Sequence, residues 1–427
     1  MRLNWSQRSR RRWLSLAALL LAGAAEPKLG DQALSVDAPE GHGTLPAFTS
    51  HSLLGRQPGV TRLLVIVESD AGEALALGKS IAGPDAAHTL VVAPQFPTQA
   101  DAKRWSLPGD RLRWAGSNWA DGLPAAGPRP ISPFSALDSV LRSVADPGLL
   151  PDLKTIVVAG EGEGADLVQL YAASTAHLDG LTKRGLQLRF VVAEPQHYLY
   201  IDQARPAPTA ACPGFNHWPY GLDGAPAYLD ELGPASLFTQ YRARDVVYLV
   251  GDASTAEPAG CEAAAQGPDP AARGRFYASY MAKLAGTPIQ HLAIVPKANA
   301  AHGLLASSCG TAALFGRGDC PALAAAPDLP AFPDAAETPK PAPEAAKPEP
   351  AKPDTAPADT TPPAVPTTPV KVEQLPPPDQ AKPDAPKPDQ VAPDGLPDPL
   401  QDANPIGPLL TRAPPPQPKP PPATPPQ

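Results

Sequence analysis

The sequence is poor in cysteine, methionine and aromatic residues, with four cysteines, two methionines and aromatic side chains at 6% of 427 positions. No Cys-x-x-Cys pair occurs, so the spacing that is typical of zinc sites is missing. No basic stripe follows the first residues, which argues against nucleic acid as a partner. These absences predict no metal, no cofactor and no nucleic-acid partner.

Proline is abundant and unevenly placed. Residues 321–427 hold 35 of the 61 prolines and carry 14 acidic against 8 basic residues. Such a segment cannot bury enough apolar surface to offset the entropy lost on ordering, so we predict a disordered tail over 321–427. Two short apolar islands, 395–400 and 406–410, are either docking motifs for a cell-envelope or protein partner or parts of an inert spacer.

The N-terminus has the pattern of an export signal. The first twelve residues include five arginines and no acid, an apolar run covers 13–22, and Ala22-Gly23-Ala24 offers a cleavage site. We therefore predict a signal peptide over 1–25 and a periplasmic or extracellular mature protein. The apolar run is too short to span a bilayer comfortably, and we predict no membrane span in the mature chain. Arg10-Arg11 also fits a twin-arginine signal, and the general route stays open beside it.

Four cysteines in an oxidising compartment predict two disulfides, for which three pairings exist. We favour Cys212–Cys261 and Cys309–Cys320. Buried, unpaired thiols are the alternative.

Continuous apolar runs alternate with helical patterns along the middle of the chain. Such runs suit parallel strands that are covered on both faces. The expected strands are 62–67, 88–93, 154–158, 188–192, 245–250 and 290–295. The expected helices are 72–81, 134–144, 165–178, 270–284 and 301–315. This alternation predicts an α/β fold with a doubly wound, mostly parallel sheet over 61–320, preceded by a lead-in loop or edge hairpin over 26–60.

Two long connections, 102–133 and 198–240, interrupt the alternation and are rich in aromatic residues. In open α/β folds the ligand crevice lies beyond the carboxyl ends of the strands, so these connections are candidate walls for it. The alternative is that their aromatic side chains only cover exposed parts of the sheet.

The segment 155–171 passes from a β-branched run through Gly160-Glu161-Gly162-Glu163-Gly164 into a helical pattern. Strand, tight turn and helix form the setting in which a G-x-S-x-G elbow presents a serine nucleophile. Here a glycine, Gly162, stands where that serine would be.

The chain resembles the α/β-hydrolase superfamily, in particular a branch found in secreted bacterial and fungal proteins. The resemblance covers about 62–316 and rests on the order and spacing of several segments. These are 91–96 (VVAPQF), 131–138 (ISPFSALD), 212–216 (CPGFN), 264–268 (AAQGP) and 312–316 (AALFG). It implies an α/β-hydrolase-like sheet, a Ser…Asp…His order along the chain and an oxyanion hole after the first strand.

Carrying the catalytic roles across leaves no intact triad. The nucleophile falls on Gly162, the acid on Ser254, and only the base position has its residue, His302. The His-Gly expected after the first strand reads Glu68-Ser69. Glycine offers no atom to attack with, and carboxylates near the elbow would oppose a developing oxyanion. The sequence therefore predicts a pseudoenzyme that acts as a binding or scaffolding module, with an unknown ligand in the former active-site cleft.

The competing hypothesis is an active, esterase-like hydrolase that uses other residues. A replacement serine such as Ser307 or Ser308 would provide the nucleophile for such an enzyme.

Two further interpretations concern the glycine turn. The string G-x-G-x-x-A beginning at Gly160 fits a dinucleotide fingerprint, but it follows the third expected strand, and its glutamates would repel a pyrophosphate. Glu161, Glu163 and Asp166 could instead hold a cation or act as acid and base, although consecutive turn residues point in different directions.

Overall fold

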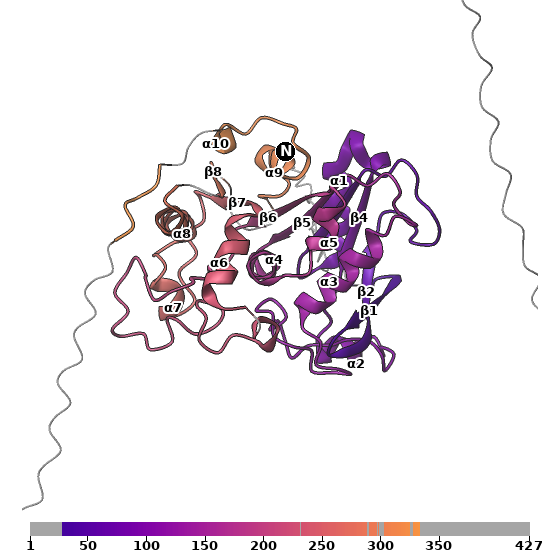
Figure 1. Ribbon diagram of the computed structural model, residues 1–427, viewed down its shortest axis with the longest axis horizontal. Helices are drawn as coiled ribbons and strands as arrows, with labels where there is room; N and C mark the ends of the chain where they lie inside the picture. The colour runs from indigo at the N-terminus through magenta and orange to yellow at the C-terminus, as the bar shows by residue number, and fades with distance from the viewer. Residues whose placement is uncertain are drawn as a thin grey trace, which may run out of the picture. The chain divides into compact units, whose positions relative to one another are not determined.

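The computed structural model describes residues 28–230, 232–287, 290–296, 298, 303–324 and 328–333. The predicted signal peptide (1–25), His302 and the part of the predicted tail after Phe332-Pro333 lie outside these residues. The described residues form one sheet with helices on both faces, and its strands run from the indigo β1–β2 pair on one side of Figure 1 to β8 on the other.

The sheet has eight strands in the order β1-β2-β4-β3-β5-β6-β7-β8. Strand β2 pairs antiparallel with both β1 and β4. Every neighbouring pair from β4 to β8 is parallel. Their bounds are β1 Gln32–Ala38, β2 Gly41–Thr49, β3 Arg62–Val67, β4 Thr89–Pro94, β5 Thr155–Glu161, β6 Gln187–Ala193, β7 Asp245–Gly251 and β8 His291–Val295. The predicted fold class, a mostly parallel α/β sheet of the hydrolase type, is confirmed.

Helices cover both faces of the sheet. Their bounds are α1 Ala71–Ala82, α2 Gln99–Arg104, α3 Pro133–Val144, α4 Glu163–Ser174, α5 Asp179–Lys183, α6 Pro234–Arg242, α7 Cys261–Ala264, α8 Pro270–Ala285, α9 Ser308–Phe315 and α10 Pro321–Ala324, with short 3-10 turns at Gly83–His88 and Ala227–Leu229. The helices α3, α4, α6 and α8 pack with one face of the sheet around a core that includes Phe134 and Val168. The helices α1 and α9 cover the other face, with Ala74 and Leu314 buried there. None of the described helices is long and apolar enough to cross a membrane.

Local signals explain where these helices begin and end. Asp70 caps α1 by accepting from the backbone N–H of Gly72 at 2.8 Å. Asp269 caps α8, Pro270 occupies its first turn, and Gly286 with φ 74° ends it.

Two helices differ from the sequence prediction. The last helix, expected from residue 301, begins at Ser308, because the Ser307 hydroxyl accepts from Gly310 N and caps it there. The helix expected over 165–178, α4, begins at Glu163 and ends at Ser174, and it is buried on nearly all sides because α6 packs on its outer side. The sequence also treated α6 as part of a long connection.

The predicted lead-in over 26–60 contains the antiparallel pair β1–β2. Of the two forms expected there, a loop and an edge hairpin, the structure has the hairpin. Near the other end, Phe332 packs against the rings of Tyr280 and Tyr200 at 5.4 Å and 6.4 Å between centroids, and Ser279 donates to the carbonyl of Pro330. The packed part of the chain therefore continues beyond the boundary predicted at residue 320.

Both favoured disulfides form. Cys212–Cys261 joins the long connection after β6 to α7, and Cys309–Cys320 joins α9 to the segment that follows it. Among the described residues no cysteine is unpaired.

Candidate functional site

The turn between β5 and α4 has the strained backbone of a nucleophile elbow. Gly162 lies at φ 59° and ψ −124°, and its N–H donates to the carbonyl of Ala193 at 3.1 Å. A positive φ of this kind is costly for a residue with a side chain and is kept where the surrounding structure holds it in place. The chain thus reverses sharply from strand to helix at the position that presents the nucleophile in a G-x-S-x-G turn.

The three glycines of the turn are present for different reasons. A Cβ on Gly164 would lie 1.8 Å from the carbonyl oxygen of Val67, and one on Gly160 would lie 2.2 Å from the carbonyl oxygen of Gly164. Gly164 therefore permits close contact between α4 and β3, and Gly160 permits close contact between α4 and its own strand, β5. A Cβ on Gly162 would meet nothing within 4 Å. Among the residues that the structure describes, no side chain enters the space into which a nucleophile would project.

Glu161, the last residue of β5, holds the turn that precedes α9. Its side chain is 5% exposed, and its two carboxylate oxygens accept from the backbone N–H groups of Leu304 at 3.1 Å and Leu305 at 3.2 Å. Charge-assisted bonds of this kind are stronger than bonds between neutral groups. The glutamate thus has a structural role in fixing the turn after β8.

Replacing Glu161 with glutamine should destabilise the fold by about 2 kcal/mol, because an NH2 group would face one of the two backbone N–H donors and leave it without an acceptor. Urea unfolding followed by tryptophan fluorescence measures this. Glu163→Gln, two residues along the same turn, is the matched control and should stay within about 0.5 kcal/mol of the parent. Equal effects of the two substitutions would contradict the assigned role.

Glu68 follows β3 beside the turn. It is 5% exposed, and its Cα lies 3.2 Å from the position of a Cβ on Gly164. Burial, together with the negative charges of Glu161, Glu73 and Asp70, raises the pKa of its carboxyl to about 8. A side chain that alternates between a neutral acid and an anion near pH 8 thus occupies the region from which an oxyanion hole would be built.

Further acidic groups surround the beginning of α4. Burial, with a contribution from Glu163, raises the pKa of Asp121 to about 6. Asp166 is buried, and burial raises the pKa of its carboxyl well above its usual range, while its Oδ1 accepts from Gln196 N at 2.7 Å. Burial and the charge of Arg273 lower the pKa of His197 to about 3, so its 3.7 Å approach to Asp166 involves a neutral imidazole.

Sequence reasoning did not find Asp121, which lies in the connection 102–133. No local motif marks it, because its proximity to Glu163 arises only when that connection packs over the sheet. The same connection carries Trp114 and Trp119, which are buried. Trp119 stacks on the ring of Phe96, and Trp114 contacts the same ring edge to face. These three aromatic side chains cover the sheet and do not line an open wall.

The acid position, Ser254, lies half-buried in the loop after β7. Because the carboxyl ends of parallel strands share one edge, this loop and the elbow after β5 lie at the same edge of the sheet, two strands apart. Asp252, the nearest carboxylate in sequence, is exposed, and its N–H donates to Val295 O at 3.2 Å. The base position, His302, is outside the described residues.

The structure separates the residues that a cation site or a replacement nucleophile at the turn would need. Glu161 binds the amides before α9 and Asp166 binds the segment after β6, so these two carboxylates do not face one ion. The one group of candidate metal ligands among the described residues includes Cys212 and Cys261, which are joined in a disulfide. The hydroxyl of Ser307, offered as a replacement nucleophile, caps α9 and donates to Leu304 O at 2.6 Å.

Comparison with known proteins finds distant similarities to solved structures. No family model matches the chain, and no curated protein matches it. Among solved structures, LpqC, a poly(3-hydroxybutyrate) depolymerase from Bordetella parapertussis, is 20% identical over 67% of this chain and 88% of its own, with a TM-score of 0.45. Poly(aspartic acid) hydrolase-1 from Sphingomonas sp. KT-1 is 18% identical over 64% and 94%, with a TM-score of 0.41. Dienelactone hydrolase from Anabaena variabilis is 13% identical over 69% and 99%, with a TM-score of 0.35.

The strand order and strand directions give the chain the α/β-hydrolase fold, as the resemblance of its sequence predicted. The chemistry at the elbow has to be argued from the residues of this chain.

Proposed function

We propose that this protein is an exported α/β-hydrolase-fold module that binds a ligand at the carboxyl edge of its sheet without transferring an acyl group. One observation carries the proposal: the backbone at Gly162 has the elbow conformation, and no described residue fills the space in front of it, but the residue has no side chain. Without a nucleophilic atom the covalent step of a serine hydrolase has no first bond to form. In a serine protease, loss of the nucleophile lowers kcat by about 10⁶.

The other roles support the same conclusion. We assign the former nucleophile, acid and base positions to Gly162, Ser254 and His302, and a serine hydroxyl at the acid position carries no charge to orient an imidazole. Above about pH 8, where Glu68 is ionised, its charge would also oppose negative charge on a tetrahedral intermediate. The loss of catalytic side chains at both the nucleophile and the acid position favours a binding or scaffolding role over a variant chemistry.

Export is part of the proposal. The arginine-rich, apolar N-terminal pattern and the two disulfides both fit an oxidising compartment outside the cytoplasm. The acidic, proline-rich tail would then connect the folded module to a partner in the cell envelope or simply space it from one.

Turnover of p-nitrophenyl acetate and p-nitrophenyl butyrate tests the loss of catalysis. The purified full chain should release p-nitrophenol at the same rate as the heat-denatured protein at the same concentration, with no saturation. Saturable turnover that is lost on denaturation would overturn the proposal. Persistence of that turnover in a Ser307→Ala, Ser308→Ala double variant would further exclude the two replacement serines.

A further inference from the structure

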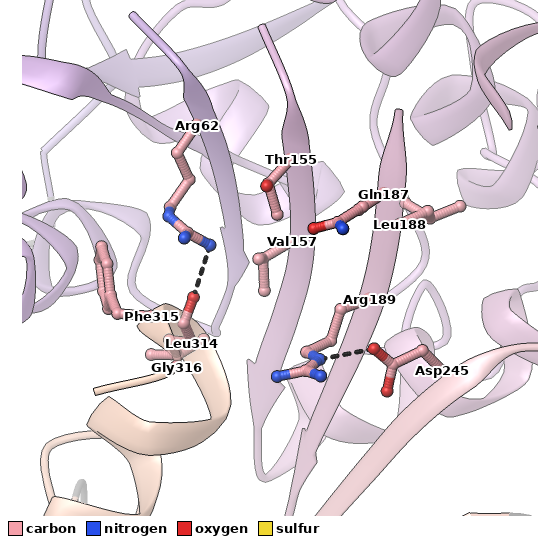
Figure 2. A pocket seen from close by; sticks show the side chains of 10 residues that line it. All are labelled: Arg62, Thr155, Val157, Gln187, Leu188, Arg189, Asp245, Leu314, Phe315 and Gly316. Atoms are coloured by element: carbon pink, nitrogen blue, oxygen red, sulfur yellow. Dashed lines mark hydrogen bonds and ion pairs between the residues drawn. The ribbon is translucent and has the colours of Figure 1, made fainter. Parts of the chain in front are cut away.

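A pocket of about 530 Å³ opens at the amino-terminal end of the strands, at the opposite end from the elbow. Arg62, Thr155, Gln187 and Asp245 line it, and each is the first residue of its strand, in β3, β5, β6 and β7 (Figure 2). The last turn of α9, with Leu314, forms its side wall.

The register of the sheet explains why polar residues meet there. Thr155 pairs with both Arg62 and Gln187, and Arg189 pairs with both Val157 and Asp245. Paired residues project to the same face of a sheet, here the face that α1 and α9 cover. The helix α9 is only eight residues long and ends at Phe315, so the amino ends of β5 and β6 extend beyond it.

Two arginines of the sheet, Arg62 in β3 and Arg189 in β6, contact the last turn of α9. Arg62 donates from Nη1 to Leu314 O at 3.0 Å, and its guanidinium lies 5.1 Å from the ring centre of Phe315. Arg189 donates from Nη1 to Ala313 O at 3.1 Å. Each arginine therefore stabilises carbonyls in the last turn of the helix, where positive charge is favourable. A guanidinium has five N–H donors, and this contact uses one of them.

The charges around the pocket do not cancel. Arg189 forms an ion pair with Asp245 at 2.7 Å, and the neighbouring Arg317 forms one with Asp85 at 2.7 Å. Within the part of the chain that the structure describes, Arg62 has no such carboxylate partner. The lining side chains therefore carry one net positive charge at neutral pH.

Burial lowers the pKa of Arg62. Among the neighbouring charges, that of Asp85 raises this pKa, and those of Arg189 and Arg317 lower it. An anion placed beside Arg62 would offset these effects and favour the charged guanidinium.

We propose that this pocket binds a small organic monoanion, an aliphatic or aromatic carboxylate, whose charged group lies on Arg62 and Arg189 and whose apolar body lies beside Phe315 at the end of α9. Planar guanidinium groups match the geometry of a carboxylate. The volume lies in the range of small-molecule sites, about 300–1,000 Å³. A single charge fits the net charge of the lining, and Asp245 disfavours the second charge of a phosphate monoester.

Calorimetric titration of the full chain with benzoate tests the proposal, with benzyl alcohol and phenyl phosphate as comparisons. Benzoate should bind, more weakly as the salt concentration rises, and the alcohol should not. Arg62→Gln should weaken benzoate binding by about tenfold or more, since a hydrogen bond to a charged group is lost. Arg242→Gln changes the charge equally on an exposed position of α6 and should leave the affinity within about twofold.

A second pair of variants decides the question if Arg62→Gln fails to fold. Gln187 is exposed at the pocket, so changes there leave the core untouched. Gln187→Glu should weaken benzoate binding and Gln187→Lys should strengthen it, each by a few-fold. The proposal fails if benzoate does not bind at about 10 mM, if benzyl alcohol binds equally well, or if the two Gln187 variants do not differ. Tighter binding of phenyl phosphate than of benzoate would contradict the monoanion. None of these results depends on catalysis at the elbow.

Discussion

Gly164→Ala should destabilise the fold by at least about 4 kcal/mol or prevent folding, whereas Gly162→Ala should cost only about 1–2 kcal/mol. The added Cβ at 164 would lie 1.8 Å from the carbonyl oxygen of Val67, and backbone atoms of a central strand cannot move aside cheaply. The Cβ at 162 enters open space, so its cost is the strain of a positive φ.

Circular dichroism and urea unfolding of the two variants measure this difference under identical conditions. The pair is matched, because each adds one methyl group to a glycine of the same turn. If both variants were equally stable, α4 would not lie tightly against the end of β3, and the elbow geometry described for Gly162 would be wrong.

Stability should also decrease as the pH rises from 5 to 8, by about 3 kcal/mol through Glu68 alone. The carboxyl of Glu68 has a pKa of about 8 in the fold, above its ordinary value of 4.5. The folded protein therefore keeps a proton that the unfolded chain releases between these values. This contribution is fully present below about pH 4.5 and is lost as the pH rises through 8.

Unfolding free energies at pH 5, 6.5 and 8 for the parent and for Glu68→Gln test this. Glutamine stays neutral, so the variant should lose this part of the pH dependence. Glu257→Gln, at an exposed position after β7, should keep the slope of the parent. A parent and a Glu68→Gln variant with the same slope would show that Glu68 is ionised in the fold throughout.

The sheet was accessible from the sequence because its strands are continuous apolar runs. The run 62–67 coincides with β3, and the other five expected strands match β4 to β8 within a few residues. The antiparallel pair β1–β2 alternates less clearly, so the sequence left it as either a loop or a hairpin. The helix α6 was missed because it is short and lies inside a connection rich in glycine and proline.

The site was only partly accessible. The spacing of the turn located the elbow at Gly162, because a strand, three glycines and a helix have a local signature. The role of Glu161 could not be inferred, since its partners Leu304 and Leu305 are more than 140 residues away. The pocket at Arg62 and Arg189 also had no sequence signature, because only the strand register brings the two arginines together.

Intact-mass spectrometry after treatment with a fluorophosphonate probe tests the central claim most directly. The four cysteines of the chain are paired in disulfides, so a Gly162→Cys variant has one unpaired thiol and serves as the accessibility control. In the native state iodoacetamide should add one group to this variant, because the space in front of residue 162 is open. The unmodified protein should gain no mass from the fluorophosphonate. A fluorophosphonate adduct on any serine of the folded domain would contradict an elbow without a nucleophile.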